Sequence, residues 1–429
     1  MAVVKDGQEC PSYLKFAVAL RATSVTFSLA TEMSLPIVSL KPRRAQPILN
    51  RHPWVFEGAI GQVSGEPAPG AEVLVQSTAS QPIGRGLFNP HSNIRVRMYS
   101  WDKDESIDEA LFAKRIDDAA ALRESILDPQ TTTASRVFFS ESDGLSGLIV
   151  DRYGEWLLVQ LTSFALAERR ELLFDLLEKR HKPRGIWLRT EKGIRESEGL
   201  EIADGLVRGE EPPRPISILE NGLTFQVDVT QGQKTGGFLD QRENYLAVSK
   251  LVRGHRILDM FCYAGGFGIT AAALGGAASI IGVDSSEPAL ELARANAELN
   301  GVTDRTEFIR ADAFKFLEEA NAKGETFDTV ILDPPKMTRR RSGLAGAMRG
   351  YRSLNELSVT LLRPGGLLVT FSCSGLISRS DLESMLAAVS TSTGRRIQIL
   401  ESRGQAADHP VSPNCPENAY LKCCICRVT

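Results

Sequence analysis

The second half of the chain repeats one unit: a short apolar run, then a loop, then a segment with apolar residues at helical spacing. The apolar runs are Arg256–Phe261, Ser279–Val283, Glu307–Arg310, Thr329–Leu332 and Gly366–Phe371. Such alternation is typical of parallel strands joined by crossover helices. The rhythm therefore predicts an α/β fold with a doubly wound, Rossmann-like sheet, whose ligands bind at the carboxyl ends of the strands.

The first half of the chain has a different pattern. From residue 37 to about residue 100, short apolar runs are separated by clusters such as Gly65–Gly70, which predicts a small β-barrel or sandwich. Asp108–Leu127 has helical spacing. Residues 136–220 mix strand and helix patterns, with a helix expected over Ala165–Arg180 and a linker candidate at Glu210–Pro215. Asn221-Gly222 then stands between two alternating runs and predicts a hairpin, because both central residues take a positive φ.

Composition bounds the class of protein. A length of 429 residues suits two or three domains. The formal net charge of -3 gives no support to nucleic-acid binding, so that argument must rest on local clusters. Seven cysteines without the spacing of secreted domains predict reduced thiols in a cytoplasmic protein. No apolar run reaches the roughly 18 residues of a membrane span.

Residues 1–33 are expected to be an N-terminal extension that is disordered or wrongly assigned to the protein. The stretch Tyr13–Ala30 is mildly apolar but contains Lys15 and Arg21, whereas a signal peptide needs an uninterrupted apolar core. Met33 is an alternative translation start, because ordered-looking sequence begins just after it.

A glycine-containing loop, Leu258–Gly268, follows the first predicted strand and opens a helix. Glycines let the backbone approach a ligand, but alone they also fit a dinucleotide fingerprint or a tight turn without a ligand. Asp284 ends the second strand, where a carboxylate can bind ribose hydroxyls. Asp312 ends the third strand and either reaches an adenine amino group, caps the next helix, or does both. Asp259 either faces an amino group of the cofactor or caps the loop.

Two further strand ends carry candidate chemistry. Asp333-Pro334-Pro335-Lys336 ends the fourth strand, and its prolines hold the aspartate in a rigid backbone. A flipped base needs such a fixed polar edge, although a simple turn is the alternative. Cys373 ends the fifth strand, where a thiolate could add to C6 of a cytosine and so activate C5 for methylation. The alternative is a small buried residue.

Basic residues gather at two places. The run from Lys336 to Arg341 follows the aspartate loop, which fits phosphate contacts, with a solvated charge run as the alternative. Lys41, Arg43, Arg44 and Arg51 form the second cluster, next to Trp54 and Phe56, which are expected to be core aromatics rather than base-stacking ones.

Cys415 and the C-terminal cysteines Cys423, Cys424 and Cys426 resemble a metal site in composition only. A terminal strand over Tyr420–Val428 would point Cys423 away from Cys424 and Cys426, and no Cys-x-x-Cys pair occurs. His52, His91 and His409 are scattered and indicate no cluster.

Six further segments, in one order, make the pattern specific. They are Arg51–Phe56, Gly84–Asn89, Ser142–Tyr153, Gln233–Arg242, Arg349–Arg352 and Gln405–Pro410. With the loops described above, they resemble the bacterial 23S ribosomal RNA cytosine-C5 methyltransferases that carry an N-terminal PUA domain. The resemblance runs from about Ser34 to the C-terminus.

This resemblance implies a PUA domain at residues 34–105, a central α/β domain at 106–215 and a class I methyltransferase domain at 216–429. It implies S-adenosylmethionine as cofactor and 23S rRNA as partner, with no metal and no membrane, and it leaves a homodimer open. Cys373 would be the nucleophile, and Asp333 would hold the cytosine through N3 and its amino group. Residues 234–240 would cover cofactor and base.

The residues expected to bind the cofactor are Asp259, Phe261, Tyr263, Ala264, Gly265, Gly266, Asp284, Asp312 and Asp333. Those expected to bind the RNA are Lys234, Pro334, Pro335, Lys336, Arg339 and Arg340. One feature departs from many RNA cytosine-C5 enzymes, which place a second cysteine in the aspartate-proline loop to help release the product. Here Lys336 and Met337 follow the prolines, so another base or water must act.

Three alternatives stay open on the sequence. The first is methylation of another RNA base or position, since Asp-Pro-Pro loops also serve exocyclic amines. The second is a non-catalytic RNA-binding assembly factor that uses the PUA domain. The third, more distant, is a nicotinamide-dependent dehydrogenase. The sequence names neither the target nucleotide nor the oligomeric state.

Overall fold

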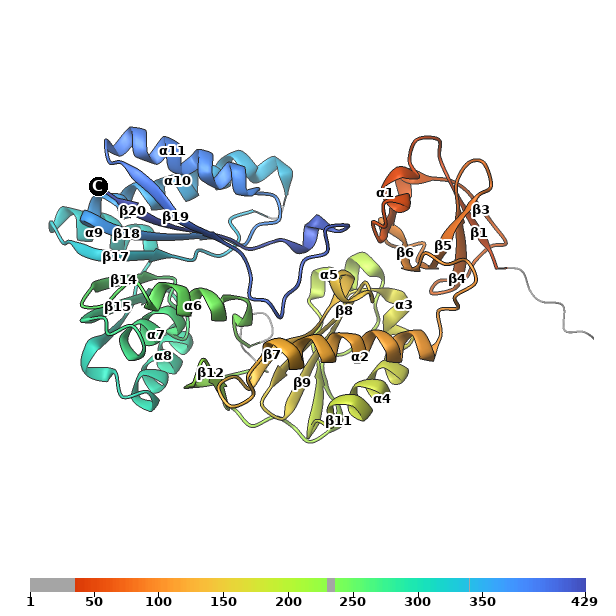
Figure 1. The fold of residues 1–429 in the computed structure, drawn as a ribbon, viewed down its shortest axis with the longest axis horizontal. Helices are drawn as coiled ribbons and strands as arrows, with labels where there is room; N and C mark the ends of the chain where they lie inside the picture. Colours follow the sequence, from red (N-terminus) through yellow and green to blue (C-terminus); the bar gives the residue numbers. More distant parts are fainter. Residues whose placement is uncertain (1–34, 230–235, 339) are drawn as a thin grey trace, which may run out of the picture. The chain divides into compact units, whose positions relative to one another are not determined.

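A computed structural model describes residues 35–229, 236–338 and 340–429, and its secondary structure forms four sheets over these residues (Figure 1). The expectation for residues 1–33, including Met33 as a start, lies outside the described residues. None of the described helices is long and apolar enough to cross a bilayer. The predicted domain limits at residues 105 and 215 remain proposals.

The N-terminal sheet has six strands in the order β2-β6-β5-β4-β1-β3, as the short runs predicted. Its elements are β1 (Ile37–Leu40), α1 (Gln46–Leu49), β2 (Trp54–Phe56), β3 (Ile60–Ser64), β4 (Glu72–Gln76), β5 (Pro82–Phe88) and β6 (Ile94–Ser100). A Cβ on Gly86 would lie 2.4 Å from Val96 and 2.6 Å from the Arg97 carbonyl oxygen, so strand β6 leaves no room for a side chain there.

The central sheet has five strands in the order β11-β10-β9-β8-β7, of which only β9 and β10 pair in parallel. The strands are β7 (Ala134–Phe139), β8 (Leu148–Tyr153), β9 (Trp156–Leu161), β10 (Gly185–Leu188) and β11 (Gly205–Gly209). The helices are α2 (Glu109–Ile126), α3 (Phe164–Ala167), α4 (Arg170–His181) and α5 (Lys192–Glu198). Helix α2 begins after Asp108, whose carboxylate accepts a hydrogen bond from the Leu111 amide.

A two-stranded hairpin follows, formed by β12 (Ile216–Glu220) and β13 (Leu223–Val227). Its turn residues Asn221 and Gly222 have φ of 55° and 80°, which confirms the turn predicted from the Asn-Gly pair.

The C-terminal sheet has seven strands in the order β16-β15-β14-β17-β18-β20-β19. The first five in the chain pair in parallel: β14 (Arg256–Met260), β15 (Ser279–Asp284), β16 (Thr306–Arg310), β17 (Phe327–Leu332) and β18 (Leu362–Ser372). Strands β19 (Ile397–Arg403) and β20 (Lys422–Val428) close the sheet in antiparallel pairing. The helices are α6 (Arg242–Ser249), α7 (Gly266–Ala273), α8 (Glu287–Leu299), α9 (Ala313–Ala322), α10 (Leu344–Leu361) and α11 (Arg379–Thr393).

The order of this sheet reverses between β14 and β17. The chain runs outward from β14 through β15 to β16 and then returns to β17 on the other side. In open α/β sheets this reversal opens a crevice at the carboxyl ends of the two strands, where ligands bind. The strand residues alternate between two cores, and Cys423 lies in one while Cys424 and Cys426 lie in the other. The predicted alternation of the terminal strand is therefore confirmed.

Candidate active site

The loops predicted to carry chemistry all follow the carboxyl ends of the parallel strands. Strands β14, β17 and β18 are neighbours in register, with Met260 opposite Leu332 and Leu332 opposite Thr370. The loop that begins at Phe261, the Asp333 loop and the Cys373 loop therefore leave the same edge of the sheet, on both sides of the reversal point. Sequence order alone does not give this adjacency, since β17 follows β16 in the chain.

The first of these loops has a strained backbone. Phe261, Tyr263 and Gly265 have φ of 63°, 49° and 84°, and the left-handed region is costly for the two aromatic residues. Tyr263 is held by its backbone amide, which donates to Asp284 at 3.0 Å, and by its hydroxyl, which donates to the Gly236 carbonyl oxygen at 3.3 Å.

Packing explains the next two glycines without a ligand. A Cβ on Gly266 would lie 2.5 Å from the ring of Tyr245, and one on Gly268 would lie 2.7 Å from Ile280. Both residues need to be glycine for helix α7 to approach α6 and β15. The glycines thus explain the fold of the loop, and the aspartates around it carry the argument for a ligand.

Asp259 caps the start of helix α7. Its buried carboxylate accepts a hydrogen bond from the Gly268 amide at 3.0 Å. Burial raises the pKa of Asp259 to about 8, and the negative charges of Asp333 and Asp284 add to the rise. Three carboxyl groups thus share the crevice, and a positively charged ligand would relieve their mutual repulsion.

The other predicted cofactor residues lie around these groups. Asp284 is half-buried and accepts from the amides of Tyr263 and Ser286, the latter at 2.9 Å. Asp312 is exposed and accepts from the Lys315 amide at 3.1 Å, so the predicted helix cap is confirmed. The Ala264 carbonyl accepts a hydrogen bond from Asn296 at 3.2 Å.

Asp333 is fixed by residues from distant segments. Its carboxylate accepts a 2.8 Å hydrogen bond from the Gln241 side chain. The side-chain amide oxygen of Gln241 accepts from the Asn244 side chain at 2.7 Å, and the side-chain oxygen of Asn244 accepts from Arg403 on β19 at 2.9 Å. Gln241 stands in a segment that the sequence marked as characteristic, but nothing in the sequence assigned it to Asp333.

Cys373 is half-buried and packs against the core that contains Phe371 and Cys423. Tyr351 of helix α10 lies near both Cys373 and Asp333. Burial raises the pKa of Tyr351 to about 12, with the charges of those two residues contributing. The structure thus brings the nucleophile candidate, the aspartate and a neutral tyrosine together.

The predicted RNA-binding residues differ in exposure. Pro334 is buried, whereas Pro335, Lys336 and Arg340 are exposed. Lys234 and Arg339 lie outside the described residues. Arg349 and Arg352 of helix α10 are exposed as well, and Arg352 is paired with Glu356 at 2.8 Å.

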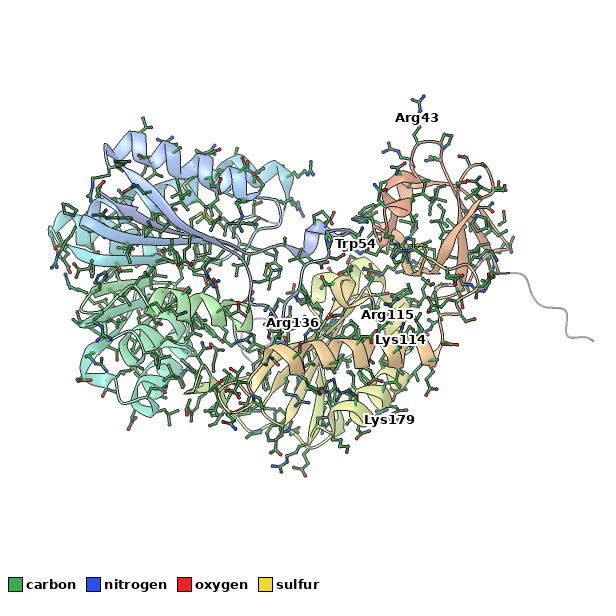
Figure 2. All side chains as sticks on the ribbon, viewed as in Figure 1. Arg43, Trp54, Lys114, Arg115, Arg136 and Lys179 are labelled. Atoms are coloured by element: carbon green, nitrogen blue, oxygen red, sulfur yellow. The ribbon has the colours of Figure 1, made fainter. Side chains whose placement is uncertain are left out.

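The N-terminal sheet departs from the prediction at both aromatic residues, since neither Trp54 nor Phe56 belongs to its buried core. Trp54 is half-buried, and its indole donates to Glu141 at 2.9 Å and to Ser146 at 3.2 Å, which gives it a structural role (Figure 2). Phe56 is 46% exposed, so its expected place in the core is wrong. The chain bends into a short 3-10 turn, Glu57–Ala59, directly after Phe56, and the last side chain of β2 stays outside the core.

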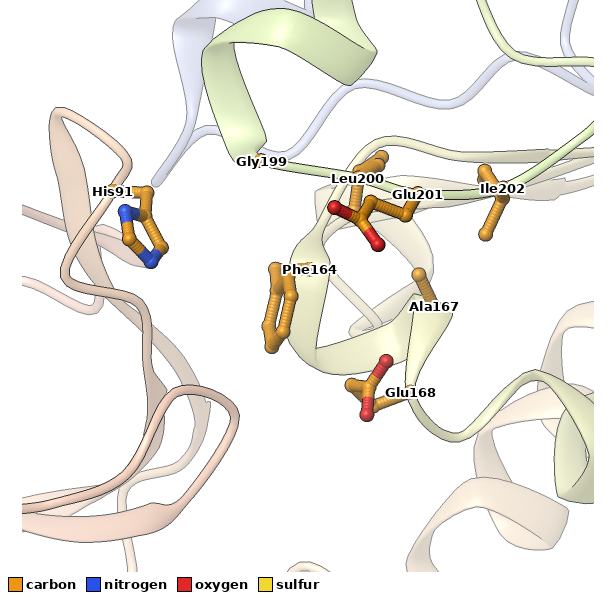
Figure 3. Close-up of a pocket in the computed structure, with 8 residues that line it drawn as sticks. All are labelled: His91, Phe164, Ala167, Glu168, Gly199, Leu200, Glu201 and Ile202. Carbon is orange, nitrogen blue, oxygen red and sulfur yellow. The ribbon is translucent and has the colours of Figure 1, made fainter.

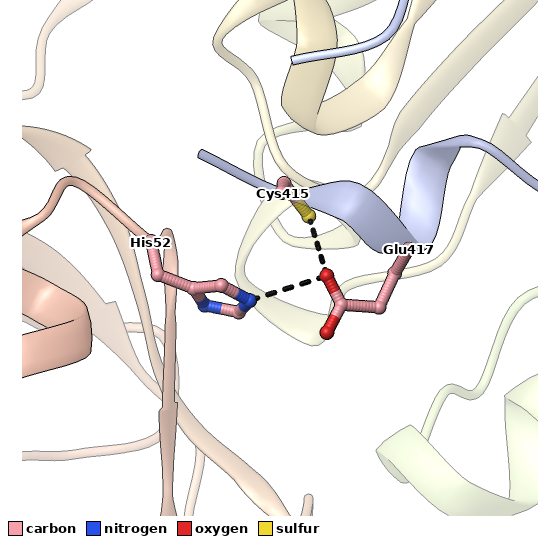
Figure 4. A group of neighbouring side chains, drawn as sticks. All are labelled: His52, Cys415 and Glu417. Atoms are coloured by element: carbon pink, nitrogen blue, oxygen red, sulfur yellow. Dashed lines mark hydrogen bonds and ion pairs between the residues drawn. The ribbon is translucent and has the colours of Figure 1, made fainter. Parts of the chain in front are cut away.

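His52, Cys415 and Glu417 form a cluster that the sequence did not indicate (Figure 4). The Glu417 carboxylate lies 3.3 Å from the His52 ring nitrogen and 3.5 Å from the Cys415 sulfur. Burial and the charges of Glu141 and Glu417 raise the pKa of Cys415 well above its usual value, so the sulfur is a thiol that donates to the carboxylate. The expectation that His52 belongs to no cluster is wrong, and hydrogen bonding accounts for the cluster without a metal.

A cavity of about 470 Å³ is lined by residues that follow strand β5, that belong to or follow helix α3, and that follow helix α5 (Figure 3). Its lining residues are His91, Phe164, Ala167, Glu168, Gly199, Leu200, Glu201 and Ile202. The two carboxylates make it unsuited to a phosphate group.

Two stretches of the chain match the models of known protein families. Residues 202–401 match the model of the S-adenosylmethionine-dependent methyltransferase family, and residues 38–101 match that of the PUA-like domain. The chain is 41% identical over 387 residues to ribosomal RNA large subunit methyltransferase I of Photobacterium profundum, covering 90% of this chain and 97% of the relative. It is 41% identical over 396 residues to the protein of that name from Aeromonas salmonicida, covering 92% and 100%.

The chain belongs to the ribosomal RNA large subunit methyltransferase I family. Its fold also matches a solved S-adenosylmethionine-dependent methyltransferase from Streptococcus mutans with a TM-score of 0.79, at 19% identity, covering 91% of this chain and 99% of that one. The predicted class I methyltransferase fold with a PUA-like domain is therefore confirmed.

The family fixes the cofactor as S-adenosylmethionine, and the crevice fits it. The cofactor carries a sulfonium and an ammonium group, and the crevice holds the mutually repelling carboxyl groups of Asp259, Asp284 and Asp333. Asp284 also stands at the end of the second strand, where such folds bind ribose hydroxyls.

Proposed function

We propose that the protein transfers a methyl group from S-adenosylmethionine to C5 of a specific cytosine in 23S rRNA, through a covalent bond between Cys373 and C6. The observation that carries the proposal is the adjacency of Cys373 and Asp333, which directly follow two neighbouring parallel strands, next to strand β14 with Asp259. The relatives named as large-subunit ribosomal RNA methyltransferases support the RNA class.

The chemistry follows from the residues at the strand ends. The Cys373 thiolate adds its electron pair to C6 of the cytosine, and the electrons of the C5–C6 double bond move to C5. S-adenosylmethionine would supply an electrophilic methyl group: as C5 takes the methyl carbon, the bond from that carbon to the sulfonium sulfur would break and leave neutral S-adenosylhomocysteine. A base then removes the proton from C5, the double bond re-forms, and Cys373 leaves as a thiolate.

Asp333 holds the base during these steps. One oxygen of Asp333 would accept a hydrogen bond from the cytosine amino group, and a proton carried by its other oxygen would pass toward N3 as the thiolate adds, which balances the negative charge that develops on the base. Its hydrogen bond from Gln241 fixes the direction of the carboxylate. Pro334 and Pro335 keep the backbone after it rigid.

The RNA would run over the exposed cations beside this loop. Lys336 and Arg340 are exposed, and Lys234 and Arg339 belong to the same proposal, although they lie outside the described residues. These side chains would contact phosphates, while the PUA-like domain would hold a second part of the RNA. A cytoplasmic location, like a homodimer, stays a prediction.

A tritium-release assay tests the position of methylation. Ribosomal RNA transcribed with [5-³H]cytidine is incubated with the protein and ¹⁴C-methyl-labelled cofactor. The proposal predicts one tritium released to water for each methyl group transferred. Methyl transfer without tritium release would place the methyl group on another atom or base, and no methyl transfer together with RNA binding would favour the assembly-factor alternative.

A further inference from the structure

Lys422, the first residue of β20, is a lysine in an unusual place. It is 5% exposed, and its position in the sheet is directly opposite Ser372, the residue before Cys373. Lysine side chains are rarely buried, because removing an ammonium group from water is costly unless its protons are satisfied. Lys422 lies outside the segments that carry the family resemblance, and no step of the proposed reaction uses it.

The ammonium group is satisfied by two backbone carbonyl oxygens. It donates to Ser374 at 2.5 Å and to Tyr420 at 2.8 Å. Ser374 is the residue after Cys373, so the strand pairing and this hydrogen bond hold the chain on both sides of the thiol. The turn is closed further by the Leu376 amide, which donates to the Ser374 hydroxyl at 3.3 Å.

The charges that face Lys422 are four groups from three parts of the fold. Cys373 at the end of β18 and Asp381 of α11 favour its charged form, whereas Lys336 of the Asp333 loop and Arg379 of α11 oppose it. Burial has the largest effect, and together these influences lower the pKa of Lys422 to about 8. The ammonium form therefore predominates at neutral pH. The attraction is mutual, so an ammonium group that a Cys373 thiolate stabilises also stabilises that thiolate.

We propose that Lys422 is a positioning residue for Cys373, which fixes the turn around the thiol through the Ser374 carbonyl and stabilises the thiolate that attacks the base. This inference rests on the proposed function, because it assigns Lys422 to the same nucleophile. It gives the thiolate the cationic neighbour that activated cysteines generally have.

The test measures the thiolate directly, in the free protein. The tested protein carries Cys10→Ser, because Cys10 lies outside the described residues and would add a second thiol to the assay. The other cysteines that the structure describes are buried, whereas Cys373 is half-buried, so the alkylation rate reports on Cys373. Iodoacetamide is added over a range of pH, and the rate of modification of the Cys373 peptide is followed by mass spectrometry. The variants are Lys422→Met, which keeps the length of the side chain, and Lys422→Arg, which keeps the charge. Lys323→Met, at an exposed helix end, is the matched control.

We expect the pH of half-maximal alkylation to rise by about one unit in Lys422→Met, in line with the effect of losing one neighbouring opposite charge. Lys422→Arg should restore most of the shift, and Lys323→Met should leave the profile unchanged. Methyl transfer by Lys422→Met at pH 7 should fall at least tenfold in kcat, with KM for the RNA little changed. An unchanged alkylation profile in a folded Lys422→Met protein would overturn the inference.

The two proposals fail separately. If Cys373→Ala keeps full activity while Lys422→Met still shifts the alkylation profile, the proposed nucleophile is wrong and the Lys422–Cys373 coupling stands. If Cys373→Ala is inactive and Lys422→Met shows the wild-type profile, the nucleophile stands and Lys422 has no part in activating it. Circular dichroism and thermal unfolding of each variant show whether the fold is kept.

Discussion

Gln241 donates a 2.8 Å hydrogen bond to the carboxylate of Asp333, across 92 residues of sequence. Gln241 is itself held by Asn244, and Asn244 by Arg403, so the direction of the carboxylate depends on α6 and on the edge strand β19. The aspartate proposed to hold the cytosine is thus aligned by a chain of hydrogen bonds that ends on strand β19.

Replacing Gln241 by Met should therefore slow methylation without loss of cofactor. Misplacing a substrate-positioning group by about 1 Å can cost up to 10²-fold in rate, and we expect a fall of about tenfold to a hundredfold in the single-turnover rate. Calorimetry should give a cofactor Kd close to that of the unchanged protein. Gln160→Met, in the central sheet, is the control, and a Gln241→Met protein with full single-turnover activity would refute the role.

Arg242 and Asp408 join two of the characteristic segments. They form two hydrogen bonds of 3.0 Å each, in a buried ion pair. Replacing Asp408 by Asn leaves the Arg242 charge buried without its partner, and breaking such a pair costs about 3–5 kcal/mol. Chemical denaturation at pH 7 should show that loss of stability. A variant with the original midpoint would contradict it.

The same carboxyl group predicts an acid limit. Burial alone would raise the pKa of Asp408, but His409 and Arg242 outweigh it and hold the pKa well below the usual range. A carboxyl group with a lowered folded-state pKa adds stability above its unfolded value of about 3.9, and that stability is lost as the pH falls further. The melting temperature should drop more steeply below about pH 4 in the original protein than in Asp408→Asn.

Cofactor binding should release protons at neutral pH. Asp259 has a pKa raised to about 8 and is mostly protonated at pH 7, and a cationic ligand beside it favours the charged form. Calorimetry of S-adenosylmethionine in buffers of different ionisation enthalpy should detect the release of up to one proton. S-adenosylhomocysteine, which lacks the sulfonium charge, should release less, and Asp259→Asn should abolish the effect. Equal heats in all buffers for the original protein would rule it out.

The raised pKa of Asp259 also makes the folding stability of the cofactor-free protein depend on pH. A raised pKa means that the folded state keeps its proton on Asp259 where the unfolded chain has lost it. The stability from this group is full below the unfolded value of about 3.9 and decreases as the pH rises toward 8. Asp259→Asn should remove that part of the decline, which thermal unfolding between pH 5 and pH 8 would measure.

The exposed cations beside Asp333 should strengthen the binding of every RNA sequence to the same extent. Removing one phosphate contact lowers the slope of log affinity against log salt by about 1. Lys336→Ala and Arg340→Ala should each show this change in filter-binding titrations, and Lys323→Ala should not. Loss of affinity for one RNA sequence alone would assign these residues to base recognition instead.

The sheet could be predicted because its signal is local. The strand predicted at Thr329–Leu332 is observed at Phe327–Leu332, and that at Gly366–Phe371 lies within Leu362–Ser372. Where a local pattern is weak, the prediction was less accurate: the helix expected over residues 165–180 is split into α3 and α4, because Arg169 leaves the helical conformation.

Three features of the structure could not be predicted, because each depends on residues brought together from distant segments. Nothing near Lys422 in the sequence indicates that it lies beside Cys373. That position depends on the antiparallel pairing of β20 with β18, which places Lys422 opposite Ser372. The hydrogen bond from Gln241 to Asp333 could not be predicted without knowing where helix α6 packs. Cys415 was grouped with the terminal cysteines by position, whereas the fold places it beside His52 and Glu417.

The covalent bond to Cys373 is the central claim, and RNA containing 5-fluorocytosine tests it most directly. The fluorine on C5 cannot leave as a proton does, so the adduct remains after methylation. We predict a protein–RNA complex that survives denaturing electrophoresis, depends on S-adenosylmethionine and maps to the Cys373 peptide by mass spectrometry, and that is absent in Cys373→Ala. A complex that persists in Cys373→Ala, or full methylation of ordinary RNA by that variant, would contradict the account.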